Sequence, residues 1–300
     1  MSQTLQGRVA VVTGASRGAG RAIAAALGEA GATVYLTGRS ARGDATTDGV
    51  PGTVDDAAEE VTARGGRGVA VRVDHAVDAE VAALFDRVRR DEGRLDLLVN
   101  NVWGGYEKAT EGPSAKPFWT LDPADAWRGM FEAGVRAHLV ASKHAVPPML
   151  PRRAGLIVNT VAWAFGDYIG SVAYDTAKAA IIRMAFGMAR ELEPFGIAAV
   201  ALAPGFMRTE RVMAAHAKHP FDLSETESPE YLGRAVVALA SDPAVIAKTG
   251  QNLTAGELAR EYGFTDVDGT QPPPFRMPEG WLKEFQAGLV RAVEGETVSA

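Results

Sequence analysis

The sequence predicts an α/β fold: a single Rossmann-like, doubly wound parallel sheet with helices on both faces. Short runs rich in β-branched residues alternate with longer amphipathic or Ala/Leu-rich stretches, in the order βαβαβαβ over the first hundred residues. A strand joined to its neighbour through a helix must run parallel to it, and such crossovers are right-handed. The same alternation continues past residue 200, so we expect one layered α/β domain.

Each element follows from a local pattern. The first strand (residues 8–13, RVAVVT) leads through a glycine-rich turn into an Ala/Leu helix that stops at Gly31. Further strands are expected at 33–37, 68–73, 95–100, from 155, 196–202 and 250–254. Helices are expected at 55–64, 78–92, 122–150, 172–194 and 228–240. Residues 257–300 are polar, with a break at three consecutive prolines, and are expected to form an extension packed on, or trailing from, the domain at 1–256.

Composition excludes several classes of function. The 300 residues include no cysteine, so disulfides and cysteine nucleophiles are impossible. The five histidines lack metal-site spacing, and the net charge of −6 argues against a nucleic-acid surface. No apolar run approaches the ~18 residues of a membrane span. The N-terminus lacks a signal-peptide pattern, so we expect a cytoplasmic protein without a metal, nucleic-acid or membrane partner.

The glycine-rich turn at 14–20 (GASRGAG) is a candidate anion site. A strand that passes through glycines into a helix N-terminus presents free N–H groups and the positive end of the helix dipole. The alternative is a turn that serves tight packing alone. The next strand ends at Gly38-Arg39-Ser40, and no acidic residue that could hold a ribose 2′-hydroxyl lies between Ala32 and Gly43. Arg39 and Arg17 instead suit the 2′-phosphate of NADP, unless both are solvated.

The central stretch (residues 155–178) begins as a buried strand and ends as a helix that carries Tyr174 and Lys178. Four residues apart, their side chains share one helix face. A phenol beside an ammonium is a plausible proton donor to a carbonyl, because a fixed positive neighbour favours the phenolate. Taken alone, the pair is also compatible with an ordinary half-buried helix.

Together these pieces resemble the short-chain dehydrogenase/reductase family. The resemblance rests on TGASRGAG at 13–20, Asp74 at a strand end, NN at 100–101, YDTAK at 174–178 and PGFMRT at 204–209, and it covers about residues 5–256. Three further segments, PFWTL…W, ESPEYLGRAVVALASDP and LAREYGFTDVDG, resemble one branch of the family and extend the match to about residue 270.

The resemblance implies an NADP-binding Rossmann domain and a role for particular residues. Tyr174 would be the general acid in ketone reduction, and Lys178 would hold the nicotinamide ribose and favour the phenolate. The remaining cofactor contacts would come from Gly14, Ser16, Arg17, Gly18 and Gly20 at the phosphates, Arg39 at the 2′-phosphate, Asp74 with His75 at the adenine, Asn100 at the ribose, and Pro204, Gly205, Met207 and Thr209 at the nicotinamide amide.

The chain also departs from the family pattern. The family serine, twelve or thirteen residues before the tyrosine, falls at Ala162 or Val161, and the family asparagine falls at Gly134. The expected NNAG reads NNVW, with Trp103 in place of glycine. Losing one positioned oxyanion donor costs on the order of 10²–10³ in rate. Candidate replacements are Thr160, Tyr168, Ser171 and His138, each of which could equally be structural.

Two functions from different classes remain open. The first is an NADPH-dependent reductase of bulky hydrophobic or aromatic ketones, a substrate class favoured by apolar side chains expected near the nicotinamide: Trp103, Tyr106, Trp163, Phe165, Tyr168, Phe206, Met207 and Met213. The second is an NADP-binding protein with weak or no redox activity. A dehydration or isomerisation on the same fold is a third possibility. The resemblance further implies a homodimer or homotetramer built through the helices at 122–150 and 172–194.

Overall fold

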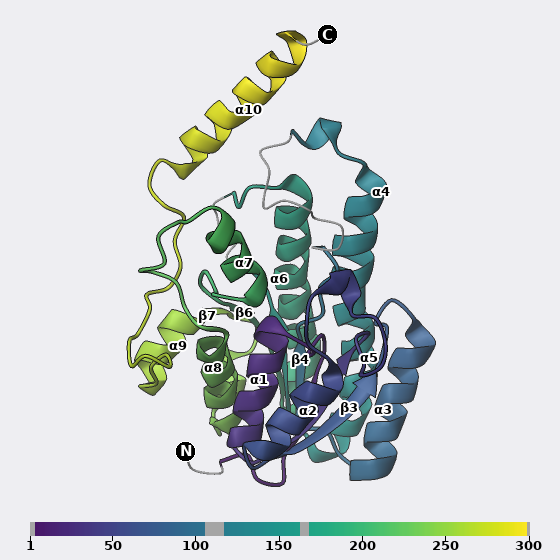
Figure 1. Ribbon diagram of the computed structural model, residues 1–300. Helices are drawn as coiled ribbons and strands as arrows, with labels where there is room; N and C mark the ends of the chain where they lie inside the picture. Colours follow the sequence, from purple (N-terminus) through teal and green to yellow (C-terminus); the bar gives the residue numbers. More distant parts are fainter. Residues whose placement is uncertain (1–3, 106–116, 163–167, 299–300) are drawn as a thin grey trace.

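A computed structural model describes residues 4–105, 117–162 and 168–298 of the chain. Its centre is a seven-stranded, wholly parallel sheet in the order β3-β2-β1-β4-β5-β6-β7 (Figure 1). The strands are β1 (Val9–Val12), β2 (Thr33–Gly38), β3 (Arg67–Arg72), β4 (Leu97–Asn100), β5 (Gly155–Thr160), β6 (Ile197–Ala203) and β7 (Asn252–Thr254). The predicted fold class is confirmed.

Helices cover both faces of the sheet, and each buries an apolar stripe against it. One layer holds α1 (Gly18–Glu29), α2 (Val54–Ala63), α8 (Pro229–Ser241) and α9 (Ala255–Tyr262), which share a core with β1, β2 and β6. The opposite layer holds α3 (Asp78–Glu92), α5 (Ala137–Met149) and α6 (Val172–Leu192). Both cores are rich in Val, Leu, Ile and Ala, so burial of apolar surface supplies the main stabilisation.

The topology places the candidate site at the carboxyl end of the sheet. From β1 the chain adds β2 and β3 on one side of the sheet, and from β4 it adds β5, β6 and β7 on the other side, so the strand order reverses between β1 and β4. In doubly wound sheets this switch point opens a crevice beyond the strand ends, where ligands bind. The glycine turn leaves β1 there, and residues 100–105 leave β4 beside it.

The predicted helix at 122–150 is interrupted in the structure. It begins as α4 (Pro123–Ala126), capped by Asp122, whose carboxylate accepts from Ala124 N–H at 2.8 Å. A ten-residue π-helical segment, η3 (Trp127–Arg136), follows before α5 resumes regular geometry. π-helical geometry is rare, and its usual form, a single-turn bulge within an α-helix, is frequently found at functional sites. The spacing of apolar residues in this part of the sequence does not predict the change from α-helical to π-helical geometry.

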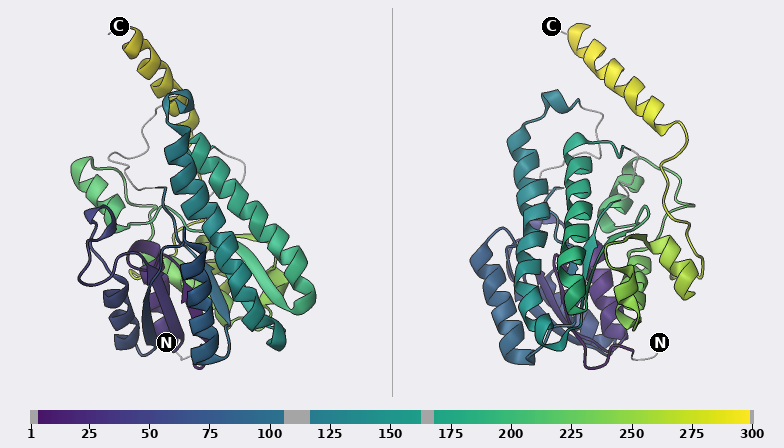
Figure 2. Two further views of the ribbon diagram at one scale, coloured as in Figure 1. Left: turned by 90° about the vertical axis from the view of Figure 1, so that its right-hand side faces the viewer. Right: turned by 180° about the vertical axis from the view of Figure 1, so that it is seen from behind.

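The C-terminal residues form two unlike parts. Helix α9 lies in the core, with Leu258 and Ala259 almost fully buried, and Gly256 packs against the proline run. Helix α10 (Trp281–Val298) projects away from the body (Figure 2) and contacts it through Trp281 and Phe285, which pack on Tyr168. Helix α7 (Glu210–Lys218), which the sequence analysis did not anticipate, lies over the carboxyl end of the sheet. None of the helices in the described residues combines the length and apolar character needed to cross a membrane.

Candidate active site

The glycine turn has a backbone that only glycine allows at its critical positions. Gly14 and Gly18 have left-handed φ values of +66° and +53°. A Cβ at Gly20 would lie 2.2 Å from the carbonyl oxygen of Gly14, so the turn and the first turn of α1 are in direct contact. The glycines at 14, 18 and 20 therefore create a narrow cradle at the start of a helix.

The N-terminus of α1 can accept an anion. Arg17 at the N-cap makes no side-chain capping bond, and the first turn holds no acidic residue. The N–H of Gly18 donates instead to Oε1 of Glu210, at 3.3 Å, from the first residue of α7. A carboxylate thus already interacts with the positive end of the helix, and this supports the fit of a dinucleotide diphosphate to the same cradle.

Asn101 holds the cradle in place, a role that the sequence analysis did not assign. Its amide nitrogen donates to the carbonyl oxygens of Thr13 and Gly14, at 3.0 and 2.9 Å. The hydroxyl of Thr13 accepts from the backbone N–H groups of Asn101 and Val102, at 2.9 and 3.1 Å. The ends of β1 and β4 are therefore locked together. The sequence did contain a signal for this role, because Asn101 follows Asn100 directly after a buried strand that ends at the ligand-binding edge of the sheet.

Arg17 reaches toward the residues that follow β2. Its guanidinium donates to the hydroxyl of Ser40 at 2.8 Å and to the carbonyl oxygens of Thr47 and Gly52, at 3.2 and 3.3 Å. Arg39 is half-buried on the same edge, and Ser16 is nearly buried beneath the turn. The two guanidinium groups are thus carried by neighbouring segments of the ligand edge.

Asp74 and His75, the two residues expected at the adenine, differ in their exposure to solvent. Asp74 is half-buried, and its carboxylate accepts from the N–H of Ala76 at 2.9 Å. His75 is buried, its Nε2 lies 2.7 Å from the hydroxyl of Thr37, and burial lowers its pKa to about 4. His75 is therefore a neutral ring within the protein at neutral pH.

The expectation for the Asn100 side chain has to be corrected. The residue is fully buried, and its amide nitrogen donates to Ser142 Oγ at 2.9 Å and to Asn159 Oδ1 at 3.0 Å. This amide links β4 to β5 and α5, so the side chain does not line the crevice. A polar residue at the last position of a buried strand can point into the sheet layers as readily as toward a ligand.

Tyr174 and Lys178 lie one turn apart on α6, as their spacing predicts. The hydroxyl of Ser171 caps the helix, accepting from the N–H of Tyr174 at 3.4 Å. Tyr174 is half-buried, whereas Lys178 is 7% exposed. The Nζ of Lys178 is 5.5 Å from the centre of the Tyr174 ring. Burial lowers the pKa of Lys178 to about 7, because desolvation disfavours the ammonium form.

Trp103 completes this cluster. The Nζ of Lys178 lies 3.7 Å from the centre of the indole, within range of a cation–π interaction. The same indole meets the Tyr174 ring edge-on, with centres 5.4 Å apart and an interplanar angle of 88°. The sequence analysis placed Trp103 in a substrate lining, but its ring packs against both members of the candidate catalytic pair.

The glycine at 134 makes room for the indole. A Cβ at Gly134 would lie 2.7 Å from Cζ3 of Trp103, and a Cβ at Gly105 would lie 2.7 Å from Cε2 and Nε1 of the same ring. An asparagine at 134 could not occupy this position with Trp103 in place. The two departures at 103 and 134 are therefore one structural feature, in which an aromatic ring fills the volume of an absent polar side chain.

The proposed replacements for the missing serine are engaged elsewhere. The hydroxyl of Thr160 donates to the carbonyl oxygen of Asn100 at 3.1 Å, and Ser171 is the cap of α6. Tyr168 packs on the α10 aromatics. His138 is buried, its Nε2 donates to the carbonyl of Val102 at 3.1 Å, and burial lowers its pKa to about 3. Thr160 and His138 therefore donate to backbone carbonyls, and Tyr168 and Ser171 have structural contacts, with α10 and at the start of α6 respectively.

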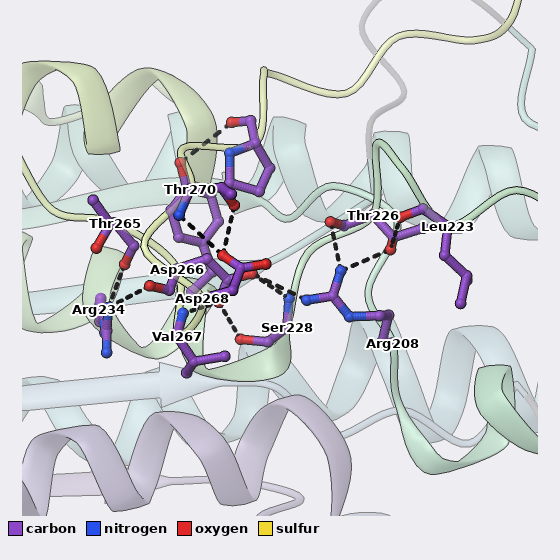
Figure 3. A network of polar contacts seen from close by, with 12 residues as sticks. Arg208, Leu223, Thr226, Ser228, Arg234, Thr265, Asp266, Val267, Asp268 and Thr270 are labelled. Carbon is purple, nitrogen blue, oxygen red and sulfur yellow. Dashed lines mark hydrogen bonds and ion pairs between the residues drawn. The ribbon is translucent and has the colours of Figure 1, made fainter.

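The segment at 204–209 is anchored to the C-terminal extension. Arg208 on this segment donates to the carbonyl oxygen and the hydroxyl of Thr226, both at 2.8 Å, and forms an ion pair with Asp266 at 3.4 Å (Figure 3). The fully buried carboxylate of Asp266 also accepts from the N–H and the hydroxyl of Ser228. A residue beyond the domain expected at 1–256 thus fixes the segment expected to frame the nicotinamide.

A second carboxyl group lies directly beside this segment. Glu227 is 1% exposed, and a Cβ at Gly205 would lie 2.7 Å from its Oε2. Burial raises the pKa of Glu227 to about 8, the nearby charge of Asp266 contributes, and a hydrogen bond from Gly205 opposes the shift. The group is thus largely protonated at neutral pH. Pro204, Met207 and Thr209 lie on the same segment, and the Thr209 hydroxyl caps α7.

The apolar lining is only partly assembled in the described residues. Phe206 is 41% exposed and packs against Phe221, and Met213 is also exposed on α7. Met207 packs against the core, so it contributes less to an open surface. Tyr106, Trp163 and Phe165 lie outside the described residues. Phe206 and Met213 therefore remain the described candidates for contact with an apolar substrate.

Comparison with known proteins identifies the family. The model of the short chain dehydrogenase family matches residues 8–220. The chain belongs to the short-chain dehydrogenase/reductase family. It is similar to dehydrogenase/reductase SDR family member 1 of Mus musculus, with 37% identity over 97% of this chain and 96% of the relative. It also resembles cis-4-hydroxycyclohexanecarboxylate dehydrogenase of Sinomonas cyclohexanicum, with 34% identity over 89% of this chain and all of the relative.

Solved structures agree with this assignment. The hydroxysteroid dehydrogenase of Escherichia coli superposes with a TM-score of 0.68, at 27% identity, over 85% of this chain and 98% of that one. A short-chain type dehydrogenase/reductase of Mycobacterium marinum superposes with a TM-score of 0.69, at 25% identity, over 83% of this chain and 94% of that one. The oxidoreductase class is therefore established by family, and nicotinamide cofactors are those of the family.

Proposed function

We propose that this short-chain dehydrogenase/reductase is an NADPH-dependent carbonyl reductase acting on bulky hydrophobic or aromatic ketones. The observation that carries the proposal is the continuity from the glycine cradle to the Tyr174–Lys178 pair. Residues 101–103 run from the amide that clamps the cradle to the indole that packs on both side chains. A cofactor held at the cradle and a proton donor on α6 would therefore share one crevice.

The residues fit the two halves of a carbonyl reduction. The nicotinamide, when bound, supplies the hydride that forms the new C–H bond at the carbonyl carbon. Tyr174 would donate its phenolic proton to the carbonyl oxygen as the C=O π bond breaks. Lys178, buried beside it, would stabilise the phenolate left behind. In the oxidation direction the same phenolate would accept the alcohol proton.

NADP preference is proposed from the arginines. Arg17 extends to Ser40 at the end of β2, and Arg39 lies on the same edge, so a 2′-phosphate would meet two planar cations. We expect Arg39→Asp to weaken NADPH binding at least tenfold and to improve NADH binding. Fluorescence titration of both cofactors measures the two dissociation constants, and an unchanged ratio would count against the assignment.

The substrate class is proposed from the lining and from relatives. Phe206 and Met213 offer exposed apolar surface beside the segment at 204–209. Two of the similar proteins are named as dehydrogenases of cis-4-hydroxycyclohexanecarboxylate and of a hydroxysteroid, and both names describe ring alcohols. We therefore expect cyclic and aryl ketones to be better substrates than short linear ones. We further propose a homodimer or homotetramer, which light scattering after size-exclusion chromatography tests.

The deciding experiment compares Tyr174→Phe with the wild type on a panel of bulky ketones. Loss of a positioned general acid should lower kcat/KM by about 10²–10⁴-fold, while NADPH binding stays unchanged. Tyr262→Phe is the matched control, because that hydroxyl bonds to Asp242 on the far side of the sheet layer. Ketone-dependent turnover that survives in Tyr174→Phe would overturn the proposed role.

A second candidate is an NADP-binding protein with weak or no redox activity. It is favoured by Ala162 and Gly134, which leave two donor positions of the family without polar side chains. Tight NADPH binding without turnover on any ketone would favour it. We prefer the reductase, because losing one oxyanion donor slows such chemistry by on the order of 10²–10³ without abolishing it.

A further inference from the structure

The side chain that the proposed reaction leaves unexplained is Trp103. It stands where a small residue is expected after a buried strand, yet it is half-buried and contacts two ionisable side chains. Two glycines, Gly105 and Gly134, allow it to lie there, and a Cβ at either would approach the indole to 2.7 Å. The local sequence is therefore adapted to this ring.

Lys178 is the group that depends on the indole most directly. Lys178 is 7% exposed, and within the described ranges the groups around its ammonium are the faces of two aromatic rings rather than a carboxylate. A buried cation without an ion pair tends to lose its proton, because the interior solvates charge poorly. An indole face, the most favourable aromatic surface for a cation, compensates part of this cost.

We propose that Trp103 is a positioning residue that keeps Lys178 charged and directed at Tyr174, in the place of a polar donor at position 134. The indole face holds the ammonium at 3.7 Å, and its edge-on contact holds the phenol ring of Tyr174. One rigid side chain therefore sets both the charge and the relative position of the pair. This inference rests on the proposed function for its kinetic consequences but not for its titration.

The groups that face Lys178 limit the alternatives. His138 on α5 interacts electrostatically with Lys178, and it is neutral at working pH because burial lowers its pKa to about 3. The pKa of Lys178 is lowered by desolvation. Tyr174 lies on the same helix. Removing the indole should therefore act on Lys178 with the phenol of Tyr174 as the neighbouring group that can titrate beside it, and Tyr174→Phe separates the two.

The test measures Lys178 directly. The chain has seven lysines, so ¹³C-labelled lysine side chains give a few resonances, and Lys178→Arg assigns the one in question. Trp103→Leu keeps an apolar side chain but removes the ring face, and Trp103→Phe keeps a smaller one. We expect the Lys178 pKa to fall by about one unit in Trp103→Leu, as a desolvated cation–π contact implies, and by less in Trp103→Phe. Trp127→Leu, whose ring is 57% exposed and stacks on Phe131, should leave it unchanged.

The kinetic arm uses the shape of the pH profile. If Lys178 must be charged, the alkaline limb of kcat/KM should move to lower pH by the same unit, so that Trp103→Leu loses about tenfold above that limb and far less below it. A uniform loss at every pH would indicate packing alone. A Lys178 pKa unchanged in folded Trp103→Phe and Trp103→Leu overturns the inference. A shifted pKa in an enzyme inactive on all ketones would refute the proposed function and leave the inference standing.

Discussion

Replacing Asp266 by asparagine should reveal how strongly the C-terminal extension supports the candidate site. The carboxylate is fully buried and ion-pairs with Arg208, and it accepts hydrogen bonds from Ser228 and from the N–H of Val267 (Figure 3). Asparagine preserves the volume but carries no charge, and its NH₂ end cannot accept. The NH₂ group of the asparagine would therefore face N–H or O–H groups that now donate to the carboxylate, and those groups would lose their acceptor.

The magnitude follows from the burial of the two partners. Breaking a buried ion pair by removing one member costs about 3–5 kcal/mol, because the other charge stays desolvated. Arg208 retains both bonds to Thr226, and its side chain is 25% exposed, which places the cost near the lower end. We expect Asp266→Asn to lose about 3 kcal/mol of unfolding free energy. With a urea m-value of about 3 kcal/mol/M for a large domain, the midpoint should fall by about 1 M.

The assay is urea unfolding followed by circular dichroism, together with NADPH titration. Because Arg208 lies on the segment at 204–209, we also expect NADPH to bind severalfold more weakly. Asp268→Asn is the control, since this nearby carboxylate is exposed, accepts from the N–H and the hydroxyl of Thr270, and has only a minor electrostatic interaction with Arg208. A midpoint for Asp266→Asn within about 0.3 M of that control would refute the reasoning.

Three further predictions concern single side chains. The pKa of Glu227 is raised from 4.5 to about 8, so the folded protein holds a proton that the unfolded chain releases, and stability falls as pH rises through that window. Glu227→Gln should match the wild type near pH 4 and exceed it by on the order of 4 kcal/mol of unfolding free energy at pH 8 in chemical unfolding. Parallel pH profiles of the two proteins would contradict this. Glu210→Gln removes the α7 carboxylate that accepts from the first turn of α1, so NADPH should bind about three- to fivefold tighter at low salt in fluorescence titration. The gain in affinity should fade at high salt. An equal affinity would show that Glu210 does not compete with the cofactor for this helix end. Gly134→Ala places a methyl group 2.7 Å from Trp103 and should lower the free energy of unfolding by about 1–3 kcal/mol. Gly187→Ala, in open space on α6, should not lower it. Equal unfolding temperatures of the two variants in calorimetry would contradict the packing argument.

Much of the architecture could be predicted because it depends on local patterns. The buried strands are continuous β-branched runs, and the helix at 78–92 has its apolar residues at helical spacing, so α3 was predicted to the residue. The glycine turn and the Tyr174–Lys178 spacing were equally readable, since both depend on residues close together in the chain. The π segment and the buried packing of α9 were not, because they depend on which surfaces the rest of the fold presents.

The amino-acid sequence by itself predicted the parallel sheet, the glycine turn at 14–20, Arg17 and Arg39 as candidate phosphate-binding residues, and the candidate pair on α6. Only the tertiary structure decided what surrounds them. It buried Asn100 between strands, engaged Thr160 in the sheet, tied Arg208 to Asp266 and joined Trp103 with Gly134. The physical reason is that side chains fill space and pair their charged and polar groups with neighbours that lie far away in the sequence. An indole and a glycine thirty-one residues apart are two departures in the chain and one packed contact in the fold.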